Sequence, residues 1–155
     1  TGVSKGCDAD MFCTNEALTR ARLAAFLVRA YDLPPATADW FTDDDGDANE
    51  SNINRAAEAG LMSGCGTTTF CPKKRTNREQ VARAIAIATS LPPATSDHFD
   101  DDDGRPLEAD IDRVAEAGIM PACGERRFCP TGSVSRGQMA RYLRLSLEPP
   151  DVPDP

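Results

Sequence analysis

An internal repeat of 58 residues constrains the fold of this 155-residue chain more than any other feature of its sequence. Each unit carries two cysteines, a phenylalanine directly before the second cysteine, and an arginine further along the chain. These positions recur without insertion as Cys7, Cys65 and Cys123; Phe12, Phe70 and Phe128; Cys13, Cys71 and Cys129; and Arg20, Arg78 and Arg136. Repeats of this length cannot bury their apolar faces alone, so we expect the units to share one core.

The phase of the repeat predicts how the chain is divided. A full unit runs from an acidic loop through a short helix and the cysteine loop into a longer helix. Because residues 1–2 align with residues 59–60, we expect the first unit to be truncated, without its acidic loop and short helix. The sequence predicts a single module over residues 1–148, with repeat portions 1–35, 36–93 and 94–148. Residues 149–155 are Pro-rich and acidic, which is typical of an extended linker or tail.

Apolar spacing and capping residues favour helices in every unit. Leu23, Phe26 and Leu27 have the i, i+3, i+4 spacing of a buried helix face. Good N-cap residues precede the long helices. They are Thr19, Asn77 and Ser135, and the last two are followed three residues later by Gln, as in a capping box. The short helices are expected to end at Gly60 and Gly118. No segment shows convincing strand alternation, so the predicted fold is mostly α, with about five helices.

The cysteines form three local pairs, each with five intervening residues: Cys7/Cys13, Cys65/Cys71 and Cys123/Cys129. This spacing does not supply the four ligands of a tetrahedral zinc site. Three disulfides in an oxidising compartment are favoured, which predicts an extracellular protein. Reduced core cysteines are the alternative, and they are less favoured because the pairs lie among Gly, Thr, Pro and charged residues.

Charge and composition exclude several classes of function. The chain has 17 Lys and Arg against 25 Asp and Glu, a formal charge of −8, which argues against a nucleic-acid partner. The longest apolar run, residues 23–28, is far too short to span a membrane. His98 is the only histidine, and its counterpart in the repeat is Trp40, which favours packing over catalysis at this position. We therefore expect no enzymatic activity.

Two acidic loops are candidate calcium sites. Their carboxylates are dense enough to repel one another, and a hard dication with oxygen ligands would relieve that repulsion. The candidate ligands are Asp43, Asp45, Asp47 and Glu50 in the first loop, and Asp101, Asp103, Arg105 and Glu108 in the second. Asp47 and Arg105 would contribute backbone carbonyl oxygens. About two structural Ca²⁺ sites are predicted. The alternative is that these acidic residues only cap the following helix, whose dipole favours negative charge.

The repeated arginines Arg20, Arg78 and Arg136 are the third candidate site. They are expected in the first turn of each long helix, where a cation is unfavourable against the helix dipole. A pairing with a neighbouring Asp would explain them structurally. Alternatively, the planar guanidinium could project into a groove between repeats and bind an anionic ligand.

The order of these motifs resembles the S-layer homology domain. The residues that carry the resemblance are Phe41, Ile53, the run Gly60-Leu61-Met62-Ser63-Gly64-Cys65, Phe70-Cys71-Pro72 and Asn77-Arg78-Glu79-Gln80. The resemblance covers residues 1–148, and the Asp-rich loops and cysteine pairs are similar to the high-G+C actinobacterial version. It implies three units around a pseudo-threefold axis and non-covalent attachment to cell-wall polysaccharide in grooves between repeats. The family's T-R-A-E motif places its arginine at Arg20, Arg78 and Arg136.

The sequence and the resemblance together predict an extracellular anchoring module at the cell surface, stabilised by calcium and disulfides. Its partner would be cell-wall polysaccharide or an envelope protein, with no nucleic acid and no membrane span. Two alternatives stay open. One is a self-assembling or protein-binding module of an extracellular layer or filament, and the other is an accessory domain of a secreted hydrolase.

Overall fold

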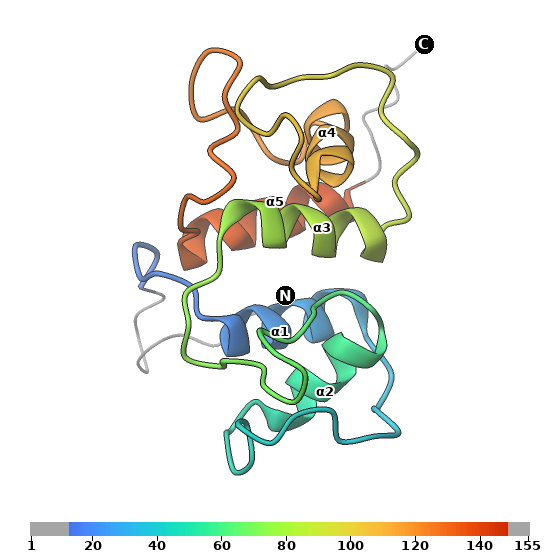
Figure 1. Ribbon diagram of the computed structural model, residues 1–155, viewed down its shortest axis with the longest axis vertical. Helices are drawn as coiled ribbons and strands as arrows, with labels where there is room; N and C mark the ends of the chain where they lie inside the picture. The colour runs from blue at the N-terminus through green and yellow to red at the C-terminus, as the bar shows by residue number, and fades with distance from the viewer. Residues whose placement is uncertain (1–12, 149–155) are drawn as a thin grey trace.

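The computed structural model describes residues 13–148, and within them the chain forms five α-helices and no strand, only isolated β-bridges (Figure 1). The helices are α1 (Arg20–Tyr31), α2 (Glu50–Glu58), α3 (Arg78–Ala88), α4 (Glu108–Glu116) and α5 (Arg136–Leu147). The prediction of a mostly α fold with about five helices is confirmed for this part of the chain. The expected tail at 149–155 and the residues Cys7 and Phe12 lie outside the described residues.

Each short helix packs against the long helix that precedes it in the chain. α2 lies against α1 and α4 lies against α3, while α1 also contacts α3 (Figure 1). Two side-chain hydrogen bonds tie α5 to the other long helices. The hydroxyls of Tyr31 in α1 and Ser146 in α5 are 2.7 Å apart, and Arg78 of α3 donates to the hydroxyl of Tyr142 in α5 at 2.8 Å. The short helix of one repeat portion is therefore buried by the long helix of its neighbour.

The predicted capping residues start and stop the helices. The side chain of Thr19 accepts a hydrogen bond from the Arg22 amide, and Asn77 and Ser135 form complete capping boxes with Gln80 and Gln138. These contacts satisfy amides that have no partner within the helix. α2 and α4 end just before Gly60 and Gly118, whose φ angles of 74° and 70° require the left-handed conformation that glycine adopts without strain.

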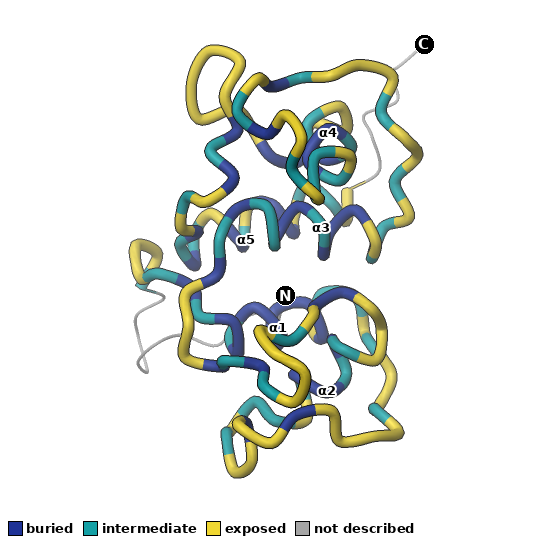
Figure 2. The backbone as a smooth tube through the Cα atoms, in the orientation of Figure 1, coloured by how far each residue is buried: buried dark blue, intermediate teal, exposed yellow. Residues whose placement is uncertain are grey.

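One apolar core joins all five helices. Leu27 of α1, Ile53 of α2, Ile85 of α3, Ile111 of α4 and Met139 of α5 are all fully buried members of it. Buried positions concentrate on the long helices, whereas the connecting loops are largely exposed (Figure 2). Phe70 and Phe128, the phenylalanines of the two described cysteine loops, are also fully buried. The cysteine loops are therefore anchored in the core although they lack regular secondary structure.

Each long helix begins against the loop of a different repeat portion. Its first two amides donate to carbonyl oxygens of that loop, at distances of 2.8–3.0 Å. The donors and acceptors are Arg20 to Lys74 and Ala21 to Pro72; Arg78 to Gly132 and Glu79 to Pro130; and Arg136 to Glu16 and Gly137 to Thr14. Helix N-termini leave such amides unpaired, so these bonds join the portions while satisfying groups that need partners.

Candidate functional site

Two of the three predicted disulfides lie within the described residues. Cys65 is bonded to Cys71, and Cys123 to Cys129. The third predicted pair includes Cys7, which lies outside the described part of the chain. Each disulfide closes the short loop that carries the buried phenylalanine. The Asp-rich and arginine motifs meet on these loops.

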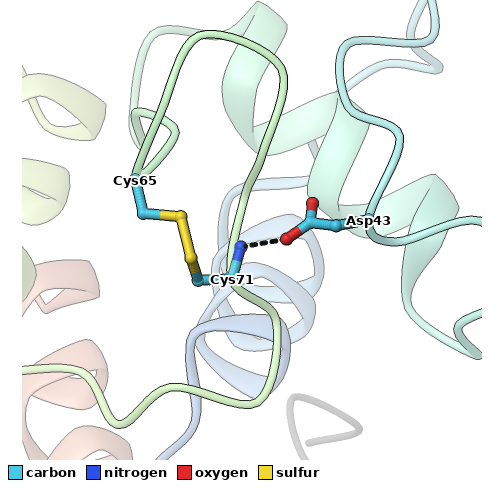
Figure 3. A group of neighbouring side chains, drawn as sticks. All are labelled: Asp43, Cys65 and Cys71. Atoms are coloured by element: carbon cyan, nitrogen blue, oxygen red, sulfur yellow. Dashed lines mark hydrogen bonds between the residues drawn. A yellow bond between two sulfur atoms is a disulfide. The ribbon is translucent and has the colours of Figure 1, made fainter.

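Asp43 holds the first disulfide loop, and its carboxylate points at the amide of Cys71 (Figure 3). Its two carboxylate oxygens accept hydrogen bonds from the amides of Phe70 and Cys71 at 2.6 and 2.7 Å. Burial disfavours the charged form, yet the two amides hold the pKa of Asp43 below its usual value. The sulfurs of Cys65 and Cys71 are bonded to each other, so this acid and the two cysteines form a structural contact and not a metal site.

Asp101 repeats this arrangement in the next unit. Its oxygens accept from the amides of Phe128 and Cys129 at 2.7 and 2.8 Å, and its pKa is lowered in the same way against the effect of burial. Asp43 and Asp101 were expected as calcium ligands. The structure instead uses both carboxylates to fix the disulfide loops.

Arg20 holds the first disulfide loop from the other side. The side chain is only 4% exposed, its Nε donates to the carbonyl oxygen of Phe70 at 2.8 Å, and Nη2 donates to the carbonyl oxygen of Ser63. Its guanidinium also lies 4.5 Å from the centroid of the Phe70 ring, within cation–π range. The loop is thus clamped between Asp43 and Arg20.

Arg78 makes the same contacts one repeat later. Its Nε donates to the carbonyl oxygen of Phe128 at 2.8 Å, Nη2 donates to that of Pro121, and the guanidinium lies 4.4 Å from the Phe128 ring centroid. Arg136 is also buried, 5.9 Å from the Phe26 ring centroid. For Arg20 and Arg78 the structure shows a role that the sequence did not suggest, the recognition of backbone carbonyls 43 and 50 residues away.

A pocket of about 210 Å³ lies where three repeat portions meet. It is lined by Arg20 from α1, residues 61–64 after α2, Gln80 and Arg83 from α3, and Leu107 at the start of α4. The Nε of Arg83 is buried and has no hydrogen-bond partner in the structure. Of the three candidate arginines, Arg20 is the one that reaches this pocket.

A separate group of carboxylates gathers beside α2. Oxygens of Asp39, Asp45 and Glu50 lie within 4.8 Å of one another, and Asp97, Asp103 and Glu108 form the equivalent group beside α4. In each group one acid comes from the linker after a long helix, one from the acidic loop and one from the start of a short helix. We refer to these two groups as the first and second carboxylate clusters.

Only part of the expected calcium set enters these clusters. Asp45, Glu50, Asp103 and Glu108 do. Asp47 accepts a hydrogen bond from the Asn49 amide at 2.8 Å, and Arg105 forms an ion pair with Glu79 at 2.9 Å. The sequence interpretation missed Asp39 and Asp97, although both recur at the repeat spacing and could have been found from it.

One acid in each acidic loop is fully buried without a partner. Asp44 is 1% exposed and Asp102 is 0% exposed, and neither carboxylate accepts a hydrogen bond from another residue. Burial raises the pKa of Asp44, and the charges of Asp39 and Glu50 add to the effect. Burial together with the charges of Asp112, Asp97 and Glu108 raises the pKa of Asp102 to about 6. The sequence interpretation did not single out either residue.

The position shared by Trp40 and His98 is not a core position. Trp40 is 49% exposed, and His98 lies with its Nε2 3.5 Å from a carboxylate oxygen of Glu116. The interpretation of this position as packing is therefore wrong for Trp40. Its indole lies at the protein surface, next in the chain to Asp39 of the first carboxylate cluster.

The fold and these contacts define a class of protein: a helical repeat module whose connecting loops are fixed by disulfides and buried charges. Residues 41–82 match the family model of the S-layer homology domain, so the chain carries an S-layer homology domain over these residues. The match covers the first acidic loop, α2, the first disulfide loop and the start of α3. No curated protein matches the chain.

S-layer homology domains are non-catalytic modules that generally anchor proteins to the cell envelope by binding cell-wall polymers. The match therefore implies an association with the cell surface, and the disulfides suit an extracellular protein. Among the helices that the structure describes, none is long and apolar enough to cross a membrane.

Proposed function

We propose that this chain is a non-catalytic extracellular anchoring module that binds cell-wall polysaccharide through grooves between its repeat portions. One observation carries the proposal. The residues that match the S-layer homology domain supply the larger part of the 210 Å³ pocket, through residues 61–64 and Gln80. Arg20, Arg83 and Leu107 complete the pocket from outside the match, and the lining residues come from all three repeat portions.

We also propose that the three portions are arranged around a pseudo-threefold axis. The support is the chain of backbone hydrogen bonds at the starts of the long helices. α1 bonds to the loop before α3, α3 to the loop before α5, and α5 to Thr14 and Glu16 before α1. Contacts that return to the first portion in this way suit a closed ring of three, and each junction of a ring would present a groove.

The groove is suited to a ligand that offers acceptor oxygens and negative charge. The unpartnered Nε of Arg83 needs an acceptor, since a buried donor without one is costly. Arg20 contributes a second guanidinium to the same wall. We extend the anion-recognising role to Arg78 and Arg136 at the other two junctions, as the family motif implies. An acidic wall polysaccharide fits this chemistry.

Sedimentation of the folded chain with purified wall material tests this function. Arg83→Gln should lower the bound fraction, with a larger loss at low salt, where charge screening is weakest. Arg29→Gln is the matched control, because it removes the same charge from an exposed position of α1. Equal binding by wild type, Arg83→Gln and a variant with Gln at all three candidate arginine positions would contradict the proposal. Concentration-dependent association without wall binding would support the assembly alternative.

A further inference from the structure

We propose that the two carboxylate clusters are calcium sites, with Asp39, Asp45 and Glu50 as ligands of the first ion and Asp97, Asp103 and Glu108 as ligands of the second. The buried carboxylates of Asp44 and Asp102 lie outside this spacing and would turn toward the ion as a fourth ligand of each site. This ligand set differs from the one expected from the loop motif. It replaces Asp43 and Asp47, and their counterparts Asp101 and Arg105, with acids from the linker and from the buried side of the loop. The inference does not depend on the polysaccharide proposal.

The spacing of the oxygens fits a common ion. Calcium binds oxygen at about 2.3–2.6 Å, so two of its ligand atoms are separated by at most about 5 Å. One oxygen each from Asp39, Asp45 and Glu50 lies within 4.8 Å of the others, and the second cluster meets the same limit. Side chains from three separate segments thus already lie at ligand spacing. The arrangement occurs twice at equivalent positions of the repeat.

The buried acids supply the independent observation that a cation belongs here. Asp44 and Asp102 are essentially unexposed, and among the described residues none donates a hydrogen bond to either carboxylate. Acids of the clusters repel these carboxylates, Asp39 and Glu50 acting on Asp44, and Asp97 and Glu108, together with Asp112, acting on Asp102. A buried carboxylate among like charges is unfavourable unless a partner compensates it. A dication shared with the cluster would be that partner.

The second cluster also borders an open cavity of about 520 Å³. Asp97, Glu108 and Asp112 line this cavity, so an ion has a route to the cluster and room to keep water ligands. Asp112 takes the place of Asn54 in the first unit, and its carboxylate accepts a hydrogen bond from the His98 amide at 3.0 Å. Arg105 and Arg113 line the same cavity, so Asp112 adds a carboxylate beside two guanidinium groups.

The donors favour calcium over other metals. All the proposed ligands are carboxylates, and the neighbouring cysteines are held in disulfides, which leaves no thiolate for a soft metal. Several carboxylates from separate segments suit the variable coordination of calcium better than the strict octahedron of magnesium. Bound calcium would join the linker, the acidic loop and the short helix. Asp43 lies in the same acidic loop and accepts the amides of Phe70 and Cys71. An ion that fixes the acidic loop would therefore also fix the disulfide loop.

Calcium titration of the disulfide-bonded chain by calorimetry tests the site. Wild type should bind two ions, Asp44→Asn should lose the first site, and Asp102→Asn should lose the second. Asp47→Asn is the matched control in the same loop: the Asp47 carboxylate accepts the Asn49 amide and lies outside both clusters, so this variant should leave both sites intact. Absence of binding heat for wild type, or loss of a site in Asp47→Asn with retention in Asp44→Asn, would overturn the assignment.

Trp40 provides a readout confined to the first site, because it is the chain's single tryptophan and adjoins Asp39. Terbium, a luminescent substitute for calcium, should be sensitised through the indole in wild type and Asp102→Asn, but not in Asp44→Asn.

In chelator, Asp44→Asn should melt no lower than wild type, because it removes an uncompensated buried charge. In calcium it should melt lower. If Asp44→Asn melts lower than wild type both in chelator and in calcium, and its terbium luminescence is unchanged, Asp44 has only a structural role and the assignment is overturned. Calcium binding without wall sedimentation would reject the proposed function and leave this assignment standing.

Discussion

Arg20 and Arg78 place a positive charge in the protein interior, and no carboxylate of residues 13–148 lies at ion-pair distance from either. Backbone carbonyl oxygens satisfy their guanidinium groups, and the buried phenylalanine rings cover their faces. A charge in this setting is stabilised only while all its acceptors stay in place. Each arginine therefore ties a disulfide loop to the long helix of the preceding portion: Arg20 of α1 holds the first loop, and Arg78 of α3 holds the second.

Arg78→Met should lower the free energy of unfolding by about 2–4 kcal/mol, because it leaves the carbonyls of Phe128 and Pro121 without their donor. Urea unfolding at neutral pH measures this change. Arg29→Met, on the exposed face of α1, serves as the control and should change stability by less than about 0.5 kcal/mol. A similar small effect at Arg78 would show that the buried hydrogen bonds add little.

The hydrogen bonds of Glu58 predict that the stability of the protein depends on pH. Hydrogen bonds from the hydroxyl and the amide of Thr37, both at 2.7 Å, lower the pKa of Glu58. A carboxyl whose pKa is lower in the folded state stabilises the protein above its unfolded pKa, and this contribution is lost as the pH falls through the folded pKa. Glu58→Gln should therefore melt below wild type at neutral pH, and the difference should disappear in acid. Thermal melts from neutral pH to about pH 3 measure it; a pH-independent gap would contradict the argument.

At the scale of elements, helix ends determine where each segment starts and stops. The capping boxes at Asn77 and Ser135 satisfy amides of α3 and α5, and the following amides are satisfied by the loop of another portion. The short helices end differently, at a glycine in the left-handed conformation. Local sequence fixes these boundaries because each cap involves residues no more than four positions apart.

Gly118→Ala should cost about 1 kcal/mol of stability through the backbone alone. The φ of Gly118 is 70°, and a Cβ at this position would meet no atom within 4 Å, so steric contacts with other residues contribute nothing. Gly118→Asn is the control, since Asn tolerates the left-handed region better and should cost less. Chemical unfolding ranks the three proteins; Ala and Asn variants of equal stability would show that the helix end relaxes.

At the scale of the whole molecule, the disulfide loops are where the repeat portions meet. Phe70 and Phe128 enter the common core from these loops, while Asp43 and Arg20 hold the first loop from two different portions. A disulfide limits the freedom of such a loop in the unfolded chain. Its contribution therefore appears as global stability.

Replacing both Cys65 and Cys71 by Ser should lower the free energy of unfolding by about 2–3 kcal/mol, the value for closing a loop of this size. The equivalent change at Cys123 and Cys129 should have a similar effect, because the two loops share their length and contacts. Denaturant unfolding gives both values, with the Cys-to-Ser double variants compared to wild type in the oxidised state. A variant as stable as wild type would mean that the side-chain clamps alone hold the loop.

Intact-mass measurement tests the disulfide prediction over the whole chain. The untreated protein should be lighter than the fully reduced one by six hydrogens, since its six cysteines form three pairs. This includes the pair Cys7/Cys13, which the structure does not describe. Thiols that react without a reductant would contradict the third pair.

The sequence by itself determined the features that rest on local spacing. The five helices, their N-caps and glycine stops, and the pairing of Cys65 with Cys71 and Cys123 with Cys129 all depend on residues close together in the chain. Short-range hydrogen bonds and chain closure govern these features, so a residue pattern is sufficient to predict them.

Only the tertiary structure decided what the charged side chains do. Arg20 and Arg78 find acceptors 43 and 50 residues away, at positions that exist only after the portions pack together. In the first acidic loop, Asp43 turns to the amides of Phe70 and Cys71, whereas the adjacent Asp44 is buried near Asp39 and Glu50. An irregular loop has no fixed period that assigns successive side chains to a face. Which Asp holds the disulfide loop and which is buried is therefore set by packing against the rest of the molecule.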